Sequence, residues 1–115
     1  MGDEFGVWQY NGGGTAWLVV QGVIDLECCP ALLGTIVDAA GRSAVNDLVI
    51  DLRRVPILTA AGIRALLEGQ AAAQWHDCGY RVVNACPIVE RVLRITGLTE
   101  VFRVGAVDHA PRSGR

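Results

Sequence analysis

The chain alternates between apolar runs and clusters of turn-forming residues. The apolar run at residues 48–50, which Asp51 and Leu52 follow, is typical of a strand buried on both faces of a sheet. Residues 5–10 and 15–24 predict an antiparallel pair, because Asn and Gly between them are suited to a tight turn. Residues 80–84 and 101–104 predict two further strands.

Three segments show the spacing of an amphipathic helix, in which apolar side chains recur every three or four residues. The first begins near Pro30 and ends at Gly41, the second covers about residues 61–76, and the third extends from Pro87 to Gly97. The expected core faces are, in chain order, Cys29, Leu32, Leu33, Ile36, Val37 and Ala40; Ile63, Leu66, Leu67 and Ala71; and Val89, Val92, Leu93 and Thr96.

The predicted element order is β-β-α-β-α-β-α-β, which belongs to the α/β class. Its strand–helix–strand units imply parallel pairing through right-handed crossovers, and the chain length is that of one domain. We expect a folded domain over residues 5–104. Residues 1–4 are expected to be a flexible N-terminus and residues 105–115 a disordered tail, since Gly, Pro, Ser, Arg and Asp dominate the latter.

Composition and charge narrow the functional classes. The net charge is -2, so there is no electrostatic case for nucleic-acid binding. No apolar stretch is long enough to cross a membrane, and the N-terminus lacks the features of a signal peptide. We therefore expect a cytoplasmic protein without direct membrane insertion, present as a monomer or weak dimer.

Catalytic and metal-binding patterns are weak. His76 falls at a helix end, where it would cap the helix dipole, and His109 lies in the tail. Glycine-rich phosphate-binding motifs are absent from the sequence, so we expect no enzyme activity and no cofactor. The cysteines, Cys28, Cys29, Cys78 and Cys86, lack zinc-site spacing and are interpreted as reduced and partly buried; a thiol switch or metal site is the alternative.

Three motifs carry a family resemblance. Residues 22–25, Gly-Val-Ile-Asp, are similar to the Gly-Glu-Leu-Asp that ends the second strand of STAS domains, a family named for sulfate transporters and anti-sigma-factor antagonists. Residues 49–67 resemble its central strand, apolar connector and Asp-Ser-Ser-Gly helix start. Residues 92–102 resemble its final helix and Val-Phe strand. The resemblance covers about residues 5–104 and implies a mixed sheet of four or five strands with helices packed mainly on one side.

The resemblance also implies a function. Stand-alone STAS proteins of this size resemble anti-sigma-factor antagonists, which bind an anti-sigma factor with a kinase-like ATP-binding fold and so release a sigma factor. The alternative is a STAS subunit of an ABC-type membrane transport system, bound to its ATPase. The expected partner-binding residues are Asp25, Leu58, Thr59, Ala60, Ala61, Gly62, Ile63 and Arg64. Asp25 and Asp51, at strand ends, could instead be solvated or cap a turn.

The sequence departs from the family pattern at its regulatory site. Ala60 occupies the place of the phosphorylated Ser, and Thr59 replaces the preceding Asp. Thr59 is either the N-cap of the following helix or a phosphate acceptor in a shifted register. A third possibility is an antagonist that is always active, or one that responds to redox state or another signal.

Overall fold

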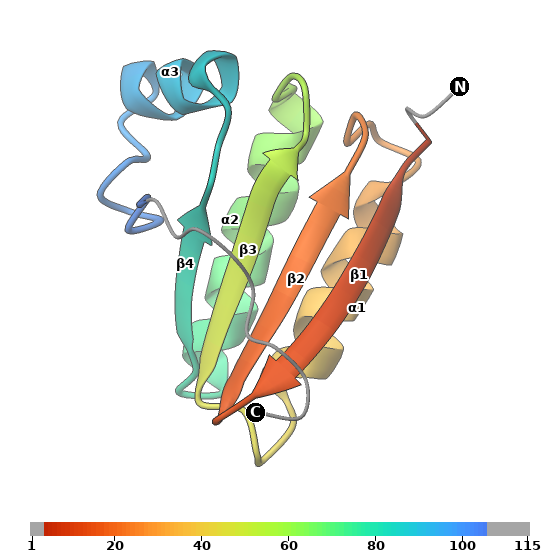
Figure 1. Ribbon diagram of the computed structural model, residues 1–115, viewed down its shortest axis with the longest axis vertical. Coiled ribbons are helices and arrows are strands. Elements are labelled where there is room, and N and C mark those ends of the chain that lie inside the picture. Colours follow the sequence, from red (N-terminus) through yellow and green to blue (C-terminus); the bar gives the residue numbers. More distant parts are fainter. Residues whose placement is uncertain (1–3, 106–115) are drawn as a thin grey trace.

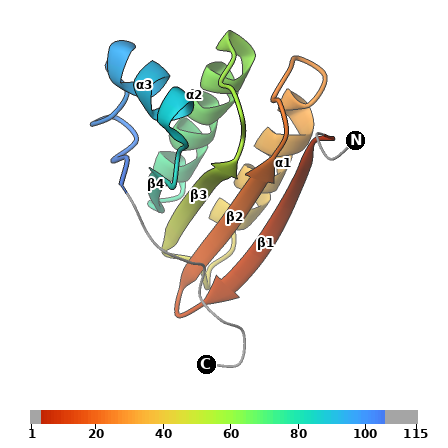
Figure 2. The same ribbon diagram turned by 45° about the horizontal axis from the view of Figure 1, so that its top comes forward.

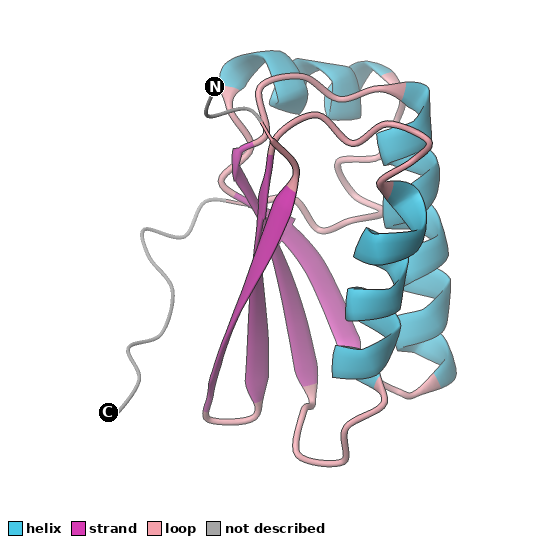
Figure 3. Ribbon diagram, turned by 90° about the vertical axis from the view of Figure 1, so that its right-hand side faces the viewer, coloured by secondary structure: helices cyan, strands magenta, loops and turns pink. Residues whose placement is uncertain are grey.

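The computed structural model describes residues 4–105 as a four-stranded sheet with helices on one face (Figures 1 and 3). The strands are β1 (Gly6–Gly12), β2 (Thr15–Gln21), β3 (Asp47–Arg54) and β4 (Gly79–Val83), in the spatial order β1-β2-β3-β4. β1 and β2 form the predicted antiparallel hairpin, and its turn residues Gly13 and Gly14 have positive φ. The pairs β2–β3 and β3–β4 are parallel.

Two long helices cover one face of the sheet. They are α1 (Cys29–Ala40) and α2 (Ala60–Trp75), and Figure 3 shows both on the same side. α3 (Pro87–Ile95) lies at the end of the sheet where the parallel strands terminate (Figure 1). Apolar side chains from β2, β3 and β4 meet those of α1 and α2 in the main core, which includes Leu18, Ile50, Val82, Leu32 and Leu66. The predicted mixed α/β fold is confirmed.

The buried face of α2 consists mainly of small residues, and here the sequence-based assignment was partly wrong. Its buried positions are Gly62, Ala65, Leu66, Gly69 and Ala73, whereas Leu67 and Ala71, both assigned to the core, are exposed. A Cβ atom on Gly69 would lie 2.8 Å from Cδ1 of Ile36 in α1, so α2 approaches α1 too closely for a side chain there. The expected core face of α2 was assigned from its large apolar residues, and it is therefore rotated about the helix axis relative to the observed buried face.

Two smaller corrections concern the other helices. Val37, assigned to the core face of α1, is 40% exposed, because Ala39 and Ala40 take the buried positions at the end of that helix. Thr96, assigned to the core face of α3, is exposed at the C-cap of that helix.

The expected strand at residues 101–104 is not present. These residues form turns, and Phe102 instead points into the core, where it is fully buried and packs edge-on against Tyr80 with ring centroids 6.1 Å apart. The segment still contacts β4 through its backbone: the Phe102 carbonyl oxygen accepts a hydrogen bond of 3.0 Å from the N–H of Val82, and Gly105 forms one isolated parallel bridge to Val83. Arg103 has a positive φ of 50°, which bends the chain between these two contacts. Residues 1–3 of the expected flexible N-terminus (1–4) and residues 106–115 of the expected disordered tail (105–115) lie outside the described part of the chain. Gly105, which was expected to belong to that tail, is instead bridged to Val83.

Within residues 4–105, no helix has the length and apolar character needed to cross a membrane.

Candidate functional site

The candidate site lies where the parallel strands end and α2 begins. The loop after β2 and the loop after β3 meet there through Thr59: its Oγ1 donates a hydrogen bond of 2.6 Å to the Ile24 carbonyl oxygen. Oγ1 of Thr59 also accepts a hydrogen bond of 3.0 Å from the backbone N–H of Gly62. Figure 2 shows the start of α2 between α3 and the loop that leads into α1.

Thr59 is the N-cap of α2, as one of the two sequence interpretations predicted. Its hydroxyl proton is engaged by Ile24 and one of its lone pairs by Gly62. Phosphorylation would replace that proton with a charged group, so the bond to the Ile24 carbonyl would be lost. The geometry therefore favours a structural role for this hydroxyl.

The loop after β2 is held in place from both ends. Gly22, with φ of 91°, donates its backbone N–H to the Arg54 carbonyl, and Ile24 is fully buried. Oδ1 of Asp25 accepts a hydrogen bond of 3.0 Å from the backbone N–H of Cys28. The pKa of Asp25 is held below its usual value of 3.8, mainly by a hydrogen bond from the Cys28 side chain and secondly by the one from the Cys28 backbone. Asp25 thus both caps a turn and remains exposed.

Two thiols connect these loops to the helices. Sγ of Cys29 lies 3.3 Å from the carbonyl oxygens of both Asp25 and Ala61. Sγ of Cys86, the N-cap residue of α3, lies 3.5 Å from the Val55 carbonyl oxygen. The four cysteines are free, as the sequence predicted, and these two act as weak hydrogen-bond donors within the site.

Of the other two thiols, Cys28 hydrogen-bonds to Asp25 within one loop and Cys78 lies in the core. Burial raises the pKa of the Cys28 thiol, with a further contribution from its hydrogen bond to Asp25. Burial likewise raises the pKa of Cys78, which lies in the core near Asp47. Both groups are therefore held in the protonated form, which is the less reactive one.

The predicted partner-binding residues divide into a surface and a floor. Asp25, Ala60 and Arg64 are exposed, and Thr59, Ala61 and Ile63 are half-buried. Leu58 and Gly62, which were expected to be presented to solvent, are buried and form the floor beneath the loop. A Cβ atom on Gly62 would lie 3.0 Å from Cδ1 of Leu58 and 3.4 Å from Cβ of Ile24, so a bulky residue there would disturb the fold.

Three exposed apolar side chains at the same end of the molecule escaped the sequence analysis. Leu26 is 76% exposed in the loop after β2, Ile57 is 49% exposed in the loop after β3, and Ile88 is 61% exposed at the start of α3. Isolated apolar residues in loops give no periodic signal. Leu26 could have been suspected, because it follows a polar turn residue and belongs to no predicted element.

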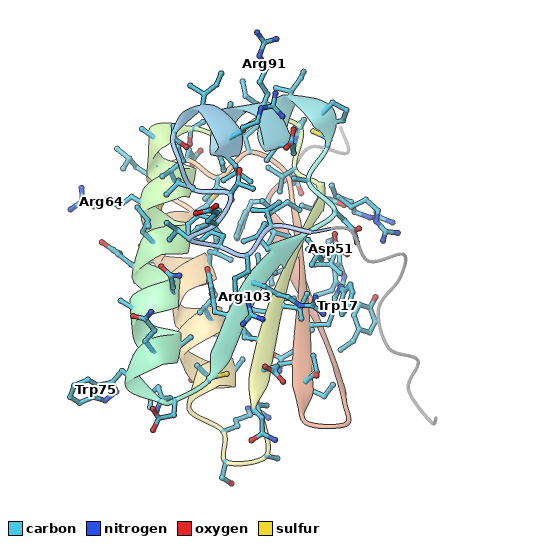
Figure 4. The ribbon with its side chains drawn as sticks, turned by 90° about the vertical axis from the view of Figure 1, so that its left-hand side faces the viewer. Trp17, Asp51, Arg64, Trp75, Arg91 and Arg103 are labelled. Carbon is cyan, nitrogen blue, oxygen red and sulfur yellow. The ribbon has the colours of Figure 1, made fainter. Side chains whose placement is uncertain are left out.

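Asp51 lies apart from this site. It is 2% exposed and occupies the face of the sheet opposite the helices, beside Trp17 (Figure 4). Its Oδ2 accepts hydrogen bonds of 3.1 Å from Nε1 of Trp17 and from Nδ2 of Asn84. Its Oδ1 accepts one of 2.9 Å from the backbone N–H of Arg53, so the turn-capping interpretation holds and the solvated one is wrong.

Metal-binding and histidine chemistry add little. Among residues 4–105, no three His, Cys, Asp or Glu side chains gather where they could hold a metal ion. His76 is the C-cap residue of α2, and its backbone N–H donates to the carbonyl oxygens of Ala72 and Ala73. His109 lies outside the described residues.

The fold and the site together define a mixed α/β domain that exposes a loop surface where its parallel strands end. A family model described as "Mlab, STAS domain" matches residues 11–105. The chain therefore belongs to the STAS domain family, which confirms the resemblance of its motifs.

Solved structures share this fold. An anti-sigma factor antagonist from Mycobacterium paratuberculosis is 28% identical, with 90% of this chain and 86% of that chain covered and a TM-score of 0.76. The anti-sigma factor antagonist SpoIIAA, a Bacillus cell fate determinant, in its unphosphorylated form is 15% identical, with 90% of each chain covered and a TM-score of 0.76. A sulfate transporter family protein from Wolinella succinogenes is 21% identical, with 80% and 76% covered and a TM-score of 0.69. No curated protein sequence matches this chain.

Proposed function

We propose that this protein is an anti-sigma-factor antagonist. It binds an anti-sigma factor with a kinase-like ATP-binding fold in the cytoplasm and thereby releases a sigma factor. The proposed activity is protein binding rather than catalysis. The 28% identical antagonist, which matches over most of both chains, supports this assignment.

The observation that carries the proposal is the exposed start of α2. Ala60 and Ala61 leave its first turn without bulky side chains, so a partner's backbone can approach closely. The exposed apolar side chains of Leu26, Ile57 and Ile88 lie at the same end of the molecule. An apolar patch with polar neighbours is typical of a protein-binding surface. We define the docking surface as Asp25, Leu26, Ile57, Thr59, Ala60, Ala61, Ile63, Arg64 and Ile88.

The proposed antagonist acts without a phosphate switch on this loop. Ala60 has no hydroxyl, and the Thr59 hydroxyl already makes two hydrogen bonds that fix the loop to Ile24 and to the start of α2. The proposed complex is therefore controlled by the amount of each protein or by a signal acting elsewhere. This is the alternative in which the switch is lost.

A matched pair of variants tests the docking surface. Ala60→Glu places a carboxylate at the start of α2, where the helix dipole favours it, so folding should be unaffected. The same charge would be buried in the proposed complex, which is costly. Ala71→Glu makes the same change on the same helix at another exposed position, about 16 Å along its axis.

Isothermal titration calorimetry with an anti-sigma factor from the same organism gives the readout. The native chain and the Ala71→Glu variant should bind equally well, and Ala60→Glu should weaken binding at least about tenfold, or about 1.4 kcal/mol. Equal binding by the native chain and by both variants would show that the interface does not include the start of α2.

The absence of a hydroxyl at Ala60 also favours a second candidate function, that of a STAS subunit in an ABC-type membrane transport system. A partnership with a transport ATPase requires no phosphate acceptor on this loop. Binding of the native chain to the ATPase subunit of such a system, together with no binding to any anti-sigma factor, would select this alternative.

A further inference from the structure

The outward side of α2 is less polar than a helix side facing water normally is. Leu67, Ala71 and Trp75 follow one another at intervals of four residues, which places them in one line along the helix surface. Trp75 is 85% exposed, Leu67 is 38% exposed, and Ala71 is exposed as well. Figure 4 shows Trp75 at one end of α2, pointing away from the sheet. We refer to Leu67, Ala71 and Trp75 as the outer ridge.

The outer ridge is not part of the core of residues 4–105. The other side of α2 already supplies the packing against α1 and the sheet, through the buried residues Gly62, Ala65, Leu66, Gly69 and Ala73. A helix that is apolar on two sides normally buries both of them. The outer ridge is therefore a candidate for a contact between molecules.

Charges of opposite sign lie at the two ends of the outer ridge. Arg64 is exposed on the same side of α2, about one turn before Leu67 (Figure 4). Asp77 is exposed and follows the C-cap of the helix directly. The helix dipole has the same polarity, because it is positive at the start of α2 and negative at its end. A second copy of α2 laid along the ridge in the antiparallel direction would bring Arg64 of one copy near Asp77 of the other, whereas a parallel copy would bring like charges together.

The side chains of the outer ridge also suit an antiparallel copy of themselves. With Ala71 of both copies at the centre, Leu67 of each copy meets Trp75 of the other. The small side chain of Ala71 lets the two helices approach closely where they cross. Leu67 and Trp75, about 12 Å apart along the helix axis, then fill the space on either side of the crossing.

We propose that two copies of this chain form a weak, two-fold symmetric dimer through the outer ridges of their α2 helices. The same patch serves both copies, as a two-fold interface requires. A tryptophan contributes about 150–250 Å² of contact area, so the two Trp75 side chains supply about 300–500 Å². The whole contact stays below about 1,200 Å², the range of transient rather than permanent complexes. The dimer therefore forms only at high protein concentration.

The dimer is separate from the docking surface at the start of α2. Only Arg64 belongs to both regions, and Ala60→Glu, which tests the docking surface, leaves the outer ridge unchanged. A dimer with so small an interface dissociates at the micromolar concentrations used in calorimetry. Ala71→Glu therefore disrupts the dimer without affecting the binding of a partner at the docking surface.

Sedimentation equilibrium of the full-length chain tests the proposal. The weight-average mass of the native chain should rise from that of one copy at micromolar concentration toward that of two copies at millimolar concentration. Trp75→Ala removes the largest side chain of the contact, and Ala71→Glu places two like charges at its centre. Each should raise the dissociation constant of the dimer at least about tenfold. The matched control Ala31→Glu, at an exposed position of α1, should leave that constant unchanged.

A mixing experiment tests the antiparallel arrangement. Arg64→Glu and Asp77→Arg each place like charges at both ends of the contact, so each chain alone should associate less than the native chain. An equimolar mixture of the two restores opposite charges at both ends and should associate as the native chain does. Far-UV circular dichroism of every variant should match that of the native chain.

Three results would overturn the proposal. The first is a native chain that remains monomeric at millimolar concentration. The second is a Trp75→Ala chain that associates as strongly as the native chain, because the contact would then lie on another surface. The third is a mixture of Arg64→Glu and Asp77→Arg that associates no better than either chain alone, because the two helices would then not be antiparallel.

Discussion

The hydroxyl of Thr59 should stabilise the fold measurably, because it joins two loops and caps a helix. The change Thr59→Ala removes the hydrogen bond to the Ile24 carbonyl and the one from the Gly62 N–H. Losing an N-cap costs typically about 1 kcal/mol, and a further intramolecular hydrogen bond contributes about 1 kcal/mol. We therefore expect Thr59→Ala to lower the free energy of unfolding by about 2 kcal/mol.

A loss of this size is easily measured in a chain of 115 residues. At about 4 °C per kcal/mol for a domain near this size, the melting temperature should fall by about 8 °C. Urea unfolding followed by circular dichroism should show a lower midpoint with an unchanged slope. The matched control is Thr59→Ser, which keeps the hydroxyl and should stay within about 0.5 kcal/mol of the native chain.

Equal stability of the Ala and Ser variants would refute this reasoning, because the hydroxyl would then contribute nothing. The same logic affects Thr59→Glu, which removes the hydroxyl and the contact with Ile24 as well as adding charge. A weaker complex formed by Thr59→Glu would therefore reflect a disturbed loop, so this variant does not mimic phosphorylation of Thr59.

Two further outcomes follow from the core. Gly69→Ala should destabilise the protein by about 1 kcal/mol despite the better helix propensity of alanine, since its Cβ would lie 2.8 Å from Cδ1 of Ile36. Gly34 lies on the exposed side of α1, and a Cβ atom added there would have no atom within 4 Å, so Gly34→Ala should instead stabilise the protein by up to about 1 kcal/mol. Changes of opposite sign in the free energy of unfolding, measured with urea, would confirm these two predictions, and changes of the same sign would contradict them. Burial raises the pKa of Tyr80, whose hydroxyl donates to the Leu66 carbonyl at 2.8 Å. The folded state then holds this proton more tightly than the unfolded state, so the stabilisation is complete below about pH 10 and declines by up to about 1.4 kcal/mol per pH unit above it. Tyr80→Phe should remove this alkaline decline, and an unchanged decline would assign it to other groups.

The sequence predicted the order and type of most elements because their signals are local. The apolar run at residues 48–50 and the turn between residues 10 and 15 depend on neighbours within a few positions. The N-cap role of Thr59 was likewise available from the residues that follow it. Such local patterns are enough to place strands, turns and helix starts.

The errors concern features that tertiary contacts decide. The strand predicted at residues 101–104 contained Phe102, which the structure instead turns into the core beside Tyr80. The face of α2 was misjudged because close packing against α1 selects Gly69 over a large residue. In both cases packing between distant segments outweighed the local preference.

The two loops that the sequence assigned to one candidate site, around Asp25 and around Thr59, do meet in the structure, but their exposed residues were misjudged. Leu58 and Gly62 belong to the floor, and the exposed Leu26 and Ile88 were not recognised. Burial within a loop depends on which side chain turns inward at each bend, and no periodic rule describes that. The bond from Thr59 to Ile24, across 35 residues of sequence, was equally beyond local reasoning.

Phosphate mapping tests the central claim, that this surface binds a partner without a phosphate switch. The native chain and an Ala60→Ser variant are incubated with ATP and an anti-sigma factor that has kinase activity, and residues 55–64 are then examined by mass spectrometry. We predict a phosphate at position 60 of the variant and none on Thr59 of the native chain, which should stay bound to its partner in the presence of ATP. A phosphate on Thr59, accompanied by dissociation of the native complex, would contradict the account.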